Sequence, residues 1–596
     1  MTRKKLLSLV GFALLMSSSL PLLSVEQEMV KPSASPSKQS DVLLNQASWT
    51  DEERRQWYHT SAGTQLLPFD WFMALNHEPF KNNLGRVGIL SDPLDESGLS
   101  VGLAKTEGPD LPTPQIGLTC SFCHTSQFTY QGKRFRIDGG PSLQYNAKFV
   151  HILMEALVEL IDPAKFQQFA ASVFQATKQQ PTAENLTALK TRVEGFTQRL
   201  LDRAGRDASP LLWGPGRFDA LGRGGNLIFF QLNPDNLRPA NAPVSIPALW
   251  GAWEYDRVQW GGSIRHPLAR NIAQVIGVNA NMFTSLVPPF DPQVDQTDPF
   301  RSSVDVPKLK FLEDLAQKLH PPRWPKEFPA IDRSQATRGK ELYHGDKKKG
   351  IPNLCAHCHV PTAIPERVGK DSRLNVTMIP YKEVGTDSLY LQNFSTRTLD
   401  AGDFRRGQRL TAKDASKLIT DGIMKRAGVM NDPEYSGLRN EWSDAAEFIA
   451  RPHVAVWATA PYLHNGSVPN LYELLSPVKE RHTCFYLSSN MEFDPQKVGF
   501  VIGECNGNPT FRDPLGGFEV KAQLPGNGNR GHEFRNSPKC AMTGKEDGVL
   551  GCEISMHDRL AIIEYLKTCD LDQVVLKDLP PCHDLKEPES IQHSGR

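Results

Sequence analysis

The sequence contains the stretch Cys120-Ser-Phe-Cys123-His124 and, further along the chain, Cys355-Ala-His-Cys358-His359. Both have the form C-x-x-C-H, which attaches a c-type haem. Two thiols at this spacing add across the two vinyl groups of the porphyrin, and the adjacent histidine binds the iron as its proximal ligand. The sequence therefore predicts two covalently bound haem c groups, which are attached at Cys120, Cys123, Cys355 and Cys358 and ligated by His124 and His359.

A disulfide or half of a zinc site is the alternative interpretation of each motif. A zinc site needs two further ligands at comparable spacing, and Cys120–His124 has none close by in the sequence. Two such motifs in one chain are also not expected by chance. The haem interpretation is therefore favoured at both places.

Composition sets the expected fold class. The 596 residues include 67 basic and 67 acidic side chains, so the formal net charge is zero. This balance argues against a nucleic-acid partner, which requires a basic face. The 45 glycines and 45 prolines, together with weak and short strand signals, predict a mainly α fold with long loops, in which two cytochrome c-type haem domains carry large insertions.

The N-terminal residues have the pattern of an export signal. Arg3, Lys4 and Lys5 precede an apolar run from Leu6 to Met16, as in a secretory signal peptide. The run is shorter than the ~20 residues of a membrane-spanning helix. An uncleaved anchor is the alternative, because no A-x-A cleavage site follows. We expect a periplasmic or secreted protein.

The domain organisation follows from the two motifs and from composition. Pro-rich segments at 284–298 and 320–329 separate the motif regions and place a boundary near residue 330. The resulting assignment is a signal peptide at 1–24, a flexible leader at 25–45, an N-terminal haem c domain at 46–330, a C-terminal haem c domain at 331–577 and a tail at 578–596.

Six further cysteines all lie in the last part of the chain, at positions 484, 505, 540, 552, 569 and 582. An even, clustered set in an exported protein predicts disulfides. Sequential pairing closes short loops, but it is one of 15 connectivities. A second metal site is the alternative.

Several helices are expected from capping and periodicity. Thr50 is a plausible N-cap, followed by acidic residues, so a helix should run through about His59. Apolar periodicity predicts further helices over Phe149–Ile161, Leu186–Leu201, Arg333–His344 and, as an amphipathic helix, Asp558–Cys569.

The sixth ligand of each iron decides its function, because two strong axial ligands suit electron transfer whereas an open position lets O₂ or peroxide bind. His532, in a glycine-rich loop, is one of six candidates at the second haem, which are His453, His464, His482, His532, Met424 and Met430. At the first haem, His151 and His266 are as well explained as ordinary surface histidines. The sequence therefore favours an open distal side at the first haem.

Longer stretches carry a family resemblance: Gly117–Thr125, Arg136–Pro141, Arg257–Gly262, Trp457–Pro469, Phe493–Phe500 and Pro525–Glu533. On these, the chain resembles the di-haem cytochrome c peroxidase/MauG superfamily, and within it the RoxA-like (rubber oxygenase-like) branch. The resemblance covers most of the chain after residue 45.

The resemblance implies roles for particular residues. His532 would be the second axial ligand of the C-terminal haem, which becomes a bis-His electron-transfer centre. Trp260 would lie between the haems and couple them electronically, and O₂ or H₂O₂ would react at the N-terminal haem. His464 and Asn465 would have a structural role, near a cation site that calcium would occupy between the domains.

The function expected is that of an exported redox enzyme, a haem oxidoreductase of peroxidase or dioxygenase type. Its partners would be O₂ or H₂O₂, with a small redox protein as electron donor or an apolar substrate. The alternative is a pure electron-transfer cytochrome without a substrate of its own.

The roles of two groups of residues near Trp260 can each be interpreted in two ways. Glu254 and Asp256 could assist proton transfer, although a solvated acidic pair is the favoured interpretation. The aromatic residues of the 225–285 region could line an apolar channel, although a role in the core is favoured; these are Phe229, Phe230, Trp250, Trp253 and Phe283.

Overall fold

The computed structural model describes residues 41–44, 49–108, 111, 113–206, 213–282, 300–362, 373–402, 405, 407–435, 438–503, 505, 517–538, 540 and 547–568. The predicted signal peptide and the tail lie outside these residues. At the end of the predicted leader, Asp41–Leu44 form strand β1, which pairs in parallel with β6 (Lys133–Asp138).

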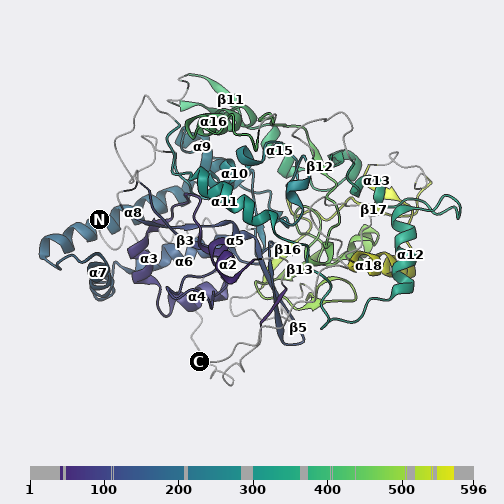
Figure 1. Cartoon of the computed structure of the whole chain (residues 1–596), viewed down its shortest axis with the longest axis horizontal. Helices are drawn as coiled ribbons and strands as arrows, with labels where there is room; N and C mark the ends of the chain where they lie inside the picture. Colours follow the sequence, from purple (N-terminus) through teal and green to yellow (C-terminus); the bar gives the residue numbers. More distant parts are fainter. Residues whose placement is uncertain are drawn as a thin grey trace.

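Helices are distributed along an elongated molecule (Figure 1). One end is built from α3 (Phe69–Leu75), α4 (Phe80–Arg86), α6 (Asn146–Glu159), α7 (Pro163–Thr177) and α8 (Ala183–Arg206). The central part holds α2 (Asp51–His59), α5 (Cys120–Cys123), α9 (Gly222–Phe229), α10 (Pro267–Ile276), α11 (Val306–Gln317), α15 (Leu389–Ser395) and α16 (Ala412–Arg426). Helices α12 (Arg333–His344), α13 (Ala356–His359) and α18 (Met556–Lys567) lie at the opposite end, while α14 (Tyr381–Val384) and α17 (Leu471–Leu474) are single turns.

Short strands form several small sheets between these helices. The three-stranded sheets have the orders β1-β6-β5 and β2-β4-β3, and the others are two-stranded. The remaining strands are β2 (Leu67–Pro68), β3 (Leu103–Thr106), β4 (Gln115–Leu118), β5 (Thr125–Tyr130), β7 (Arg217–Phe218), β8 (Val244–Ser245), β9 (Met378–Pro380), β10 (Thr398–Asp400), β11 (Arg409–Thr411), β12 (Glu447–Ile449), β13 (Cys484–Leu487), β14 (Phe493–Asp494), β15 (Gly499–Phe500), β16 (Phe518–Lys521), β17 (Glu533–Phe534) and β18 (Val549–Gly551). The chain is thus a mixture of helices and small sheets, with more sheet than the weak strand signals indicated.

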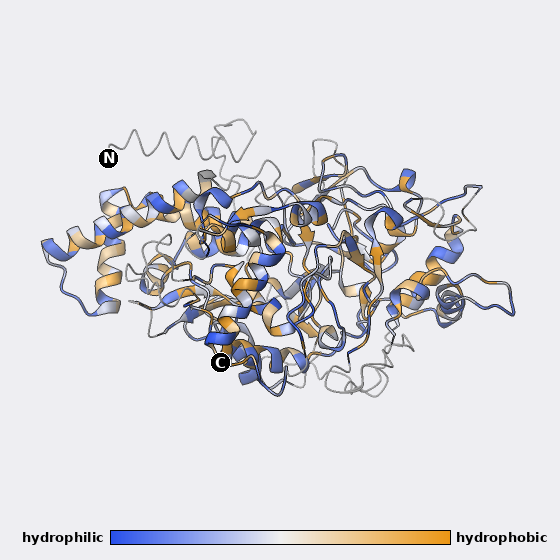
Figure 2. Ribbon diagram, turned by 90° about the horizontal axis from the view of Figure 1, so that it is seen from above, coloured by the Kyte–Doolittle hydropathy of each residue, from blue (hydrophilic) through white to orange (hydrophobic). Residues whose placement is uncertain are grey.

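Many of the helices cover part of a core with one face. Figure 2 shows hydrophobic and hydrophilic residues side by side on the same helices, as expected for amphipathic elements. One hydrophobic cluster lies among α3, α6, α7 and α8, and a second among α2, α10, α11 and α16. The first motif lies between them, because Cys120 packs against the second cluster while Phe122 belongs to the first.

The third cluster joins distant parts of the chain. The β5–β6 hairpin directly follows the first motif, and Phe128 stacks on Phe493 with ring centroids 5.0 Å apart. Phe328 stacks on Phe493 at 5.1 Å, and Thr129 N–H donates to the carbonyl of Met491 at 2.8 Å. This cluster also contains α12 and α18 residues, so segments on both sides of residue 330 share one core.

Two helices begin where the sequence predicts. Thr50 caps α2 in a capping box: its Oγ1 accepts from Glu53 N–H at 3.1 Å, and Glu53 Oε2 accepts from Thr50 N–H at 2.8 Å. Helix α12 runs over Arg333–His344 as predicted, with Asp332 as its N-cap.

Helix α18 differs from the amphipathic helix expected over Asp558–Cys569. It is buried on most sides, including Arg559, Tyr565 and Lys567. The cause is a close crossing with α12: a Cβ on Gly339 would lie 1.9 Å from the Ala561 carbonyl oxygen. Only glycine at this position lets the two backbones approach so closely, and α12 therefore covers a side of α18 that would otherwise face water.

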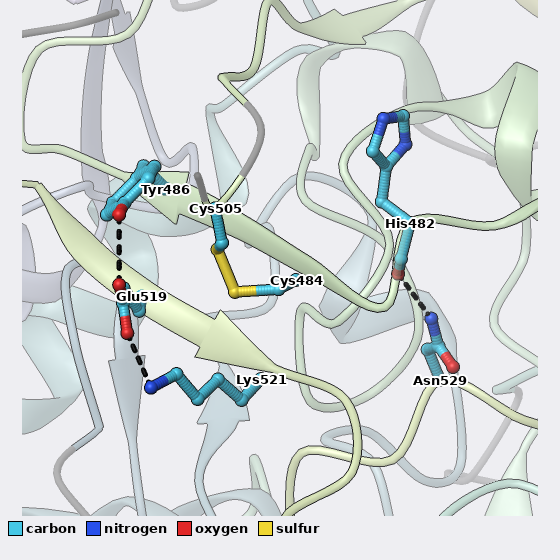
Figure 3. Close-up of a disulfide and its surroundings, with 7 residues drawn as sticks. All are labelled: His482, Cys484, Tyr486, Cys505, Glu519, Lys521 and Asn529. Carbon is cyan, nitrogen blue, oxygen red and sulfur yellow. Dashed lines mark hydrogen bonds and ion pairs between the residues drawn. A yellow bond between two sulfur atoms is a disulfide. The ribbon is translucent and has the colours of Figure 1, made fainter. Parts of the chain in front are cut away.

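Two disulfides follow the sequential pairing. Cys484 is bonded to Cys505 and Cys540 to Cys552, whereas positions 569 and 582 lie outside the described residues. Figure 3 shows the first bridge beside the paired strands β13 and β16, where Glu519 accepts from Tyr486 Oη at 2.9 Å and pairs with Lys521 at 2.6 Å. In the same view, Asn529 Nδ2 donates to the carbonyl of His482 at 2.8 Å.

The Cys484–Cys505 bridge should stabilise the protein measurably. It closes a loop with a sequence separation of 21 residues, for which restriction of the unfolded chain contributes about 3 kcal/mol. We expect the double variant Cys484→Ala/Cys505→Ala to lose about this much free energy of unfolding. Urea unfolding followed by circular dichroism measures the loss, and treating the wild type with a reductant at matched conditions is the control. A loss below about 1 kcal/mol would contradict the expectation.

Candidate haem sites

The first motif is held by backbone contacts to α2. Thr119 Oγ1 and Ser121 Oγ both donate to the Tyr58 carbonyl, at 3.1 and 3.3 Å. Gly102 N–H donates to the same carbonyl at 3.3 Å; its φ is +87°, and a Cβ on it would come within 2.3 Å of Phe122 Cα. No side chain fits there, so the α5 turn packs directly on the backbone at residue 102.

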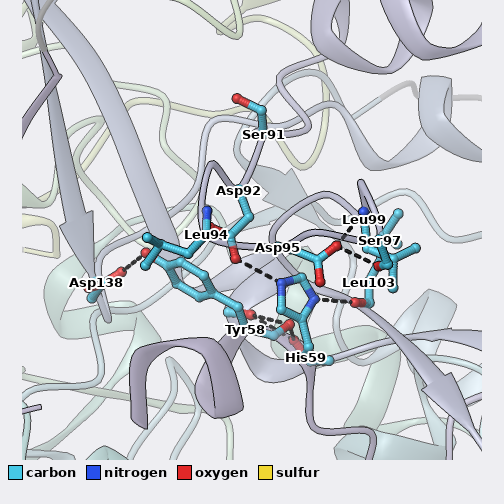
Figure 4. A network of polar contacts seen from close by, with 12 residues as sticks. Tyr58, His59, Ser91, Asp92, Leu94, Asp95, Ser97, Leu99, Leu103 and Asp138 are labelled. Carbon is cyan, nitrogen blue, oxygen red and sulfur yellow. Dashed lines mark hydrogen bonds and ion pairs between the residues drawn. The ribbon is translucent and has the colours of Figure 1, made fainter. Parts of the chain in front are cut away.

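A buried polar network fixes α2 in this position (Figure 4). Tyr58 Oη donates to Asp138 Oδ1 at 2.6 Å, and Arg54 Nε donates to Asp138 Oδ2 at 3.1 Å. The His59 ring lies between the Leu103 carbonyl at 2.8 Å and Asp92 Oδ2 at 2.9 Å. Both sets of contacts tie the helix before the motif to the strands around it.

His124, the predicted iron ligand of the first motif, follows α5 directly. Its Nδ1 atom is buried and has no partner at hydrogen-bond geometry. Burial lowers the pKa of His124 to about 4, a nearby Pro247 carbonyl opposes this effect, and the positive charge of Arg451 adds to it. The imidazole is therefore neutral at neutral pH, which is the state that binds a metal.

The two sixth-ligand candidates at the first motif make other contacts. His151 lies on α6, where its Nε2 pairs with Glu155 at 2.9 Å. His266 caps α10: its Nδ1 accepts from Ala269 N–H at 3.3 Å, and its ring packs on Tyr435. Within the described ranges, no aromatic or imidazole ring makes a ring contact with His124.

The expectation that Glu254 and Asp256 form a solvated pair is wrong. Their side chains are buried, with relative exposures of 8% and 1%. Asp256 Oδ1 accepts from Val376 N–H at 3.2 Å, and its Oδ2 lies 3.5 Å from Arg265. The pair is enclosed because the backbone around Tyr255 forms a parallel β-bridge with Leu374. This contact joins distant parts of the chain and has no local sequence signal.

The second motif opens into a cavity of about 210 Å³. Cys355, Cys358 and His359 line it together with His532, and its walls are mostly apolar. Helix α12 leads into the motif, and Ile562 and Leu566 of α18 close one side. The structure therefore brings both predicted thiols and both predicted iron ligands of the second haem to one enclosed space.

His359 is oriented by the backbone. Its Nδ1 donates to the Arg451 carbonyl at 2.7 Å, so its Nε2 is left for another partner. Burial lowers the pKa of His359 to about 4, partly opposed by this hydrogen bond. A ligating histidine typically donates its other ring N–H in this way, which fixes the tautomer and the direction of the ring.

His532 lies opposite, in an unusual backbone conformation. Its φ is +46°, and the conformation is held because its N–H donates to the Val384 carbonyl at 2.7 Å and its carbonyl accepts from Arg481 Nη2 at 3.0 Å. Such strain is typical of functional positions. Burial lowers the pKa of His532 to about 3, so this imidazole is also neutral.

The spacing of the two rings fits one iron between them. The ring centroids of His359 and His532 are 6.2 Å apart. An imidazole nitrogen lies about 2 Å from its metal and the ring centre about 1 Å further, so two trans imidazoles should have centroids about 6 Å apart. The residues therefore fit a bis-His haem at Cys355–His359.

The other candidate sixth ligands of the second haem do not have this spacing from His359, or make other contacts. His453 stacks on His359 with centroids only 3.8 Å apart, which leaves no room for an iron between those two rings. His464 packs on Phe448, and His482 pairs with Glu473. Met424 is buried in the second hydrophobic cluster, whereas Met430 is exposed.

One short segment touches both motif sites. Pro247 lies near His124, while its neighbours Ile246 and Ala248 line the cavity of the second motif. The Ala248 carbonyl accepts from Arg451 Nη2 at 3.1 Å, and the Arg451 carbonyl in turn accepts from His359. The two motif histidines are thus connected through a continuous set of contacts.

Trp260 lies beside this segment. Its side chain lines the cavity, and its Nε1 donates to the Ser245 carbonyl at 2.7 Å. The Arg451 guanidinium lies over the Trp260 ring, 5.3 Å from the centroid. The coupling role that the family resemblance implies for Trp260 stays a prediction.

The aromatic residues near Trp260 divide between core and cavity. Phe229 belongs to the second hydrophobic cluster, as the core interpretation predicts. Trp250 is buried in the third cluster and also lines the cavity, with its Nε1 donating to the Val454 carbonyl at 2.8 Å. Position 283 lies outside the described residues. Sequence reasoning missed Tyr255 and Arg451, which line the same cavity.

A buried histidine of this cavity should make stability pH-dependent. Burial lowers the pKa of His464 from its usual 6.5 to about 3. Below pH 6.5 the unfolded chain binds a proton there that the folded chain does not, so stability falls as pH falls. The loss between pH 7 and pH 5 is about 2 kcal/mol.

The variant His464→Phe, which keeps an aromatic contact with Phe448, should therefore lose about 2 kcal/mol less than the wild type over this pH range. Urea unfolding at both pH values measures the difference. His557→Phe, at an exposed position, is the matched control and should follow the wild type. Identical pH dependence in His464→Phe and the wild type would contradict the assignment.

The described part of the chain contains neither a further metal-binding cluster nor a membrane-spanning helix. No cluster of three or more His, Cys, Asp or Glu side chains there is placed to hold a metal ion, and the calcium ion stays a prediction. Among the same residues, no helix is long and apolar enough to cross a membrane.

Comparison with known proteins gives three findings. A family described as "RoxA-like, cytochrome c-like" matches residues 447–486, the segment that carries Arg451, His453 and His464. The chain is 31% identical over 590 residues to the uncharacterized protein y4iJ of Sinorhizobium fredii (strain NBRC 101917 / NGR234), spanning 89% of this chain and 94% of that protein. It is 25% identical over 262 residues to the uncharacterized protein y4iM of the same strain, spanning 44% of this chain and 50% of that one.

Proposed function

The chain belongs to the same family as the protein y4iJ, and from its RoxA-like, cytochrome c-like match at residues 447–486 we propose that it is an exported di-haem c-type cytochrome acting as a redox enzyme. O₂ or H₂O₂ would react at the haem of Cys120–His124, and electrons would pass through the haem of Cys355–His359. When bound, haem c supplies an iron that exchanges single electrons and, where an axial position is open, binds O₂ or peroxide.

The observation that carries the proposal is the inequality of the two sites. At the second motif, His359 and His532 line one cavity with ring centroids 6.2 Å apart, which suits a closed electron-transfer centre. At the first motif, His151 and His266 are engaged by Glu155, Ala269 and Tyr435. This difference supports an accessible iron at His124.

Several residues of the chain would have separate roles in this reaction. His124 and His359 would hold the irons as neutral imidazoles, and the Arg451 carbonyl fixes the direction of the His359 ring. Trp260, fixed by its hydrogen bond to Ser245, would couple the sites electronically. The apolar walls of the second cavity exclude water, which keeps that site suited to electron storage.

The deciding experiment is the electronic and EPR spectrum of the purified resting protein, followed by titration of the resting protein with H₂O₂ and of the dithionite-reduced protein with O₂. We expect one low-spin and one high-spin haem, with only the high-spin signal changing on addition of either ligand. If both haems are low-spin and neither ligand binds, the enzyme proposal fails and a pure electron-transfer cytochrome remains. Comparing turnover of an electron-donor protein with that of an apolar alkene would separate peroxidase from oxygenase.

A further inference from the structure

Two polar side chains in the wall of the second cavity, Tyr255 and Arg451, have no carboxylate partner among the described residues. Tyr255 lines the cavity, and its buried hydroxyl has no hydrogen-bond partner. Arg451 also lines the cavity, and its guanidinium donates to the Ala248 carbonyl at 3.1 Å. Within the residues that the structure describes, no carboxylate pairs with this guanidinium.

Both groups are donors at neutral pH. The Arg451 guanidinium carries N–H donors and a positive charge, because an arginine side chain is not deprotonated in proteins. The Tyr255 hydroxyl is an O–H donor. A buried charge without a counter-charge and a buried hydroxyl without an acceptor are both unfavourable. Together, Arg451 and Tyr255 therefore indicate a negatively charged ligand that accepts hydrogen bonds.

The two donors belong to the same wall. Tyr255 packs in a small cluster with Ile449 and Val454, the residues that flank Arg451 in the chain, and the two side chains interact electrostatically. The guanidinium also lies over Trp260, 5.3 Å from the ring centroid. A ligand between the donors would therefore be adjacent to this indole.

We propose that Arg451 and Tyr255 form a carboxylate-binding site in this cavity. A guanidinium offers a planar pair of charged donors that matches a carboxylate, and the hydroxyl supplies a further hydrogen bond. The carboxylate has two sources: a propionate of the haem attached at Cys355 and Cys358, or a free carboxylic acid entering the cavity. Either one neutralises the positive charge over Trp260. The site does not depend on where O₂ or H₂O₂ reacts.

The test compares variants of the holoprotein. Tyr255→Phe removes one hydroxyl and keeps the ring, and Arg451→Met removes the charge while keeping an apolar chain over Trp260. The matched control is Tyr462→Phe, because the Tyr462 hydroxyl lines the same cavity but already donates to the Val456 carbonyl at 3.2 Å. Tyr255→Phe alone decides the test if Arg451→Met does not fold.

Two measurements distinguish the sources. If the ligand is a propionate, resonance Raman bands of the haem propionates shift in Tyr255→Phe and Arg451→Met but not in Tyr462→Phe, and the midpoint potential of one haem falls in Arg451→Met because a positive charge is lost. If the ligand is a free acid, calorimetry detects saturable binding of butyrate to the wild type, weakened at least about tenfold in both variants. Wild-type propionate bands in both variants, together with no loss of butyrate binding, would overturn the proposal.

Discussion

Replacing His532 with alanine is expected to convert one of the two haems completely from low-spin to high-spin. The two rings at the second motif have the spacing of trans ligands, so loss of one leaves the iron five-coordinate. Electronic absorption and EPR spectra measure the change. Added imidazole should restore the low-spin signal, because it can occupy the space that the side chain leaves in the cavity.

His453→Leu is the matched control for this experiment, since His453 lies in the same cavity but stacks on His359. In this variant the haem of Cys355–His359 should stay low-spin, and the spectrum should match that of the wild type. An unchanged spectrum in His532→Ala would remove His532 as a ligand, and a high-spin conversion in His453→Leu would transfer the role to His453.

The second large effect is expected from removing one attachment site at a time. The double variant Cys120→Ser/Cys123→Ser should keep a single covalent haem, which is low-spin and unreactive toward O₂ and H₂O₂. The double variant Cys355→Ser/Cys358→Ser should also keep one, but with a high-spin, reactive iron. The pyridine haemochrome assay after acid extraction counts the covalently held haem in each variant.

These two variants also test the asymmetry of the sites directly. Reactivity that survives in Cys120→Ser/Cys123→Ser and disappears in Cys355→Ser/Cys358→Ser would reverse the assignment of the two haems. Retention of two covalent haems in either variant would contradict the attachment motifs themselves.

Features encoded by neighbouring residues could be predicted from the sequence. The Thr50 cap with Glu53 three residues later, and the helix over Arg333–His344, depend on contacts within a few residues. The motif chemistry is equally local, because C-x-x-C-H places two thiols and an imidazole within one turn.

Features that depend on distant contacts were missed or misjudged. The enclosure of Asp256 by Val376 and the burial of α18 against Gly339 have no signal in the residues nearby. The same holds for Tyr255 and Arg451, which become cavity neighbours only in the folded chain. For His532, the glycine-rich loop indicated a close approach, but the positions of the six candidates relative to His359 are set only in the folded chain.

The β5–β6 hairpin has a consequence for the order of events during biosynthesis. Thr129 bonds to Glu492, which is 363 residues later, and at about 5–20 residues per second the ribosome needs roughly 20–70 s to make that stretch. Until then the hairpin beside Cys120 and Cys123 lacks Phe493, the ring that stacks on Phe128. The first attachment site would therefore stay open to the haem-ligating machinery for a long interval, and a truncated chain that ends before residue 492 should aggregate rather than form a small cytochrome.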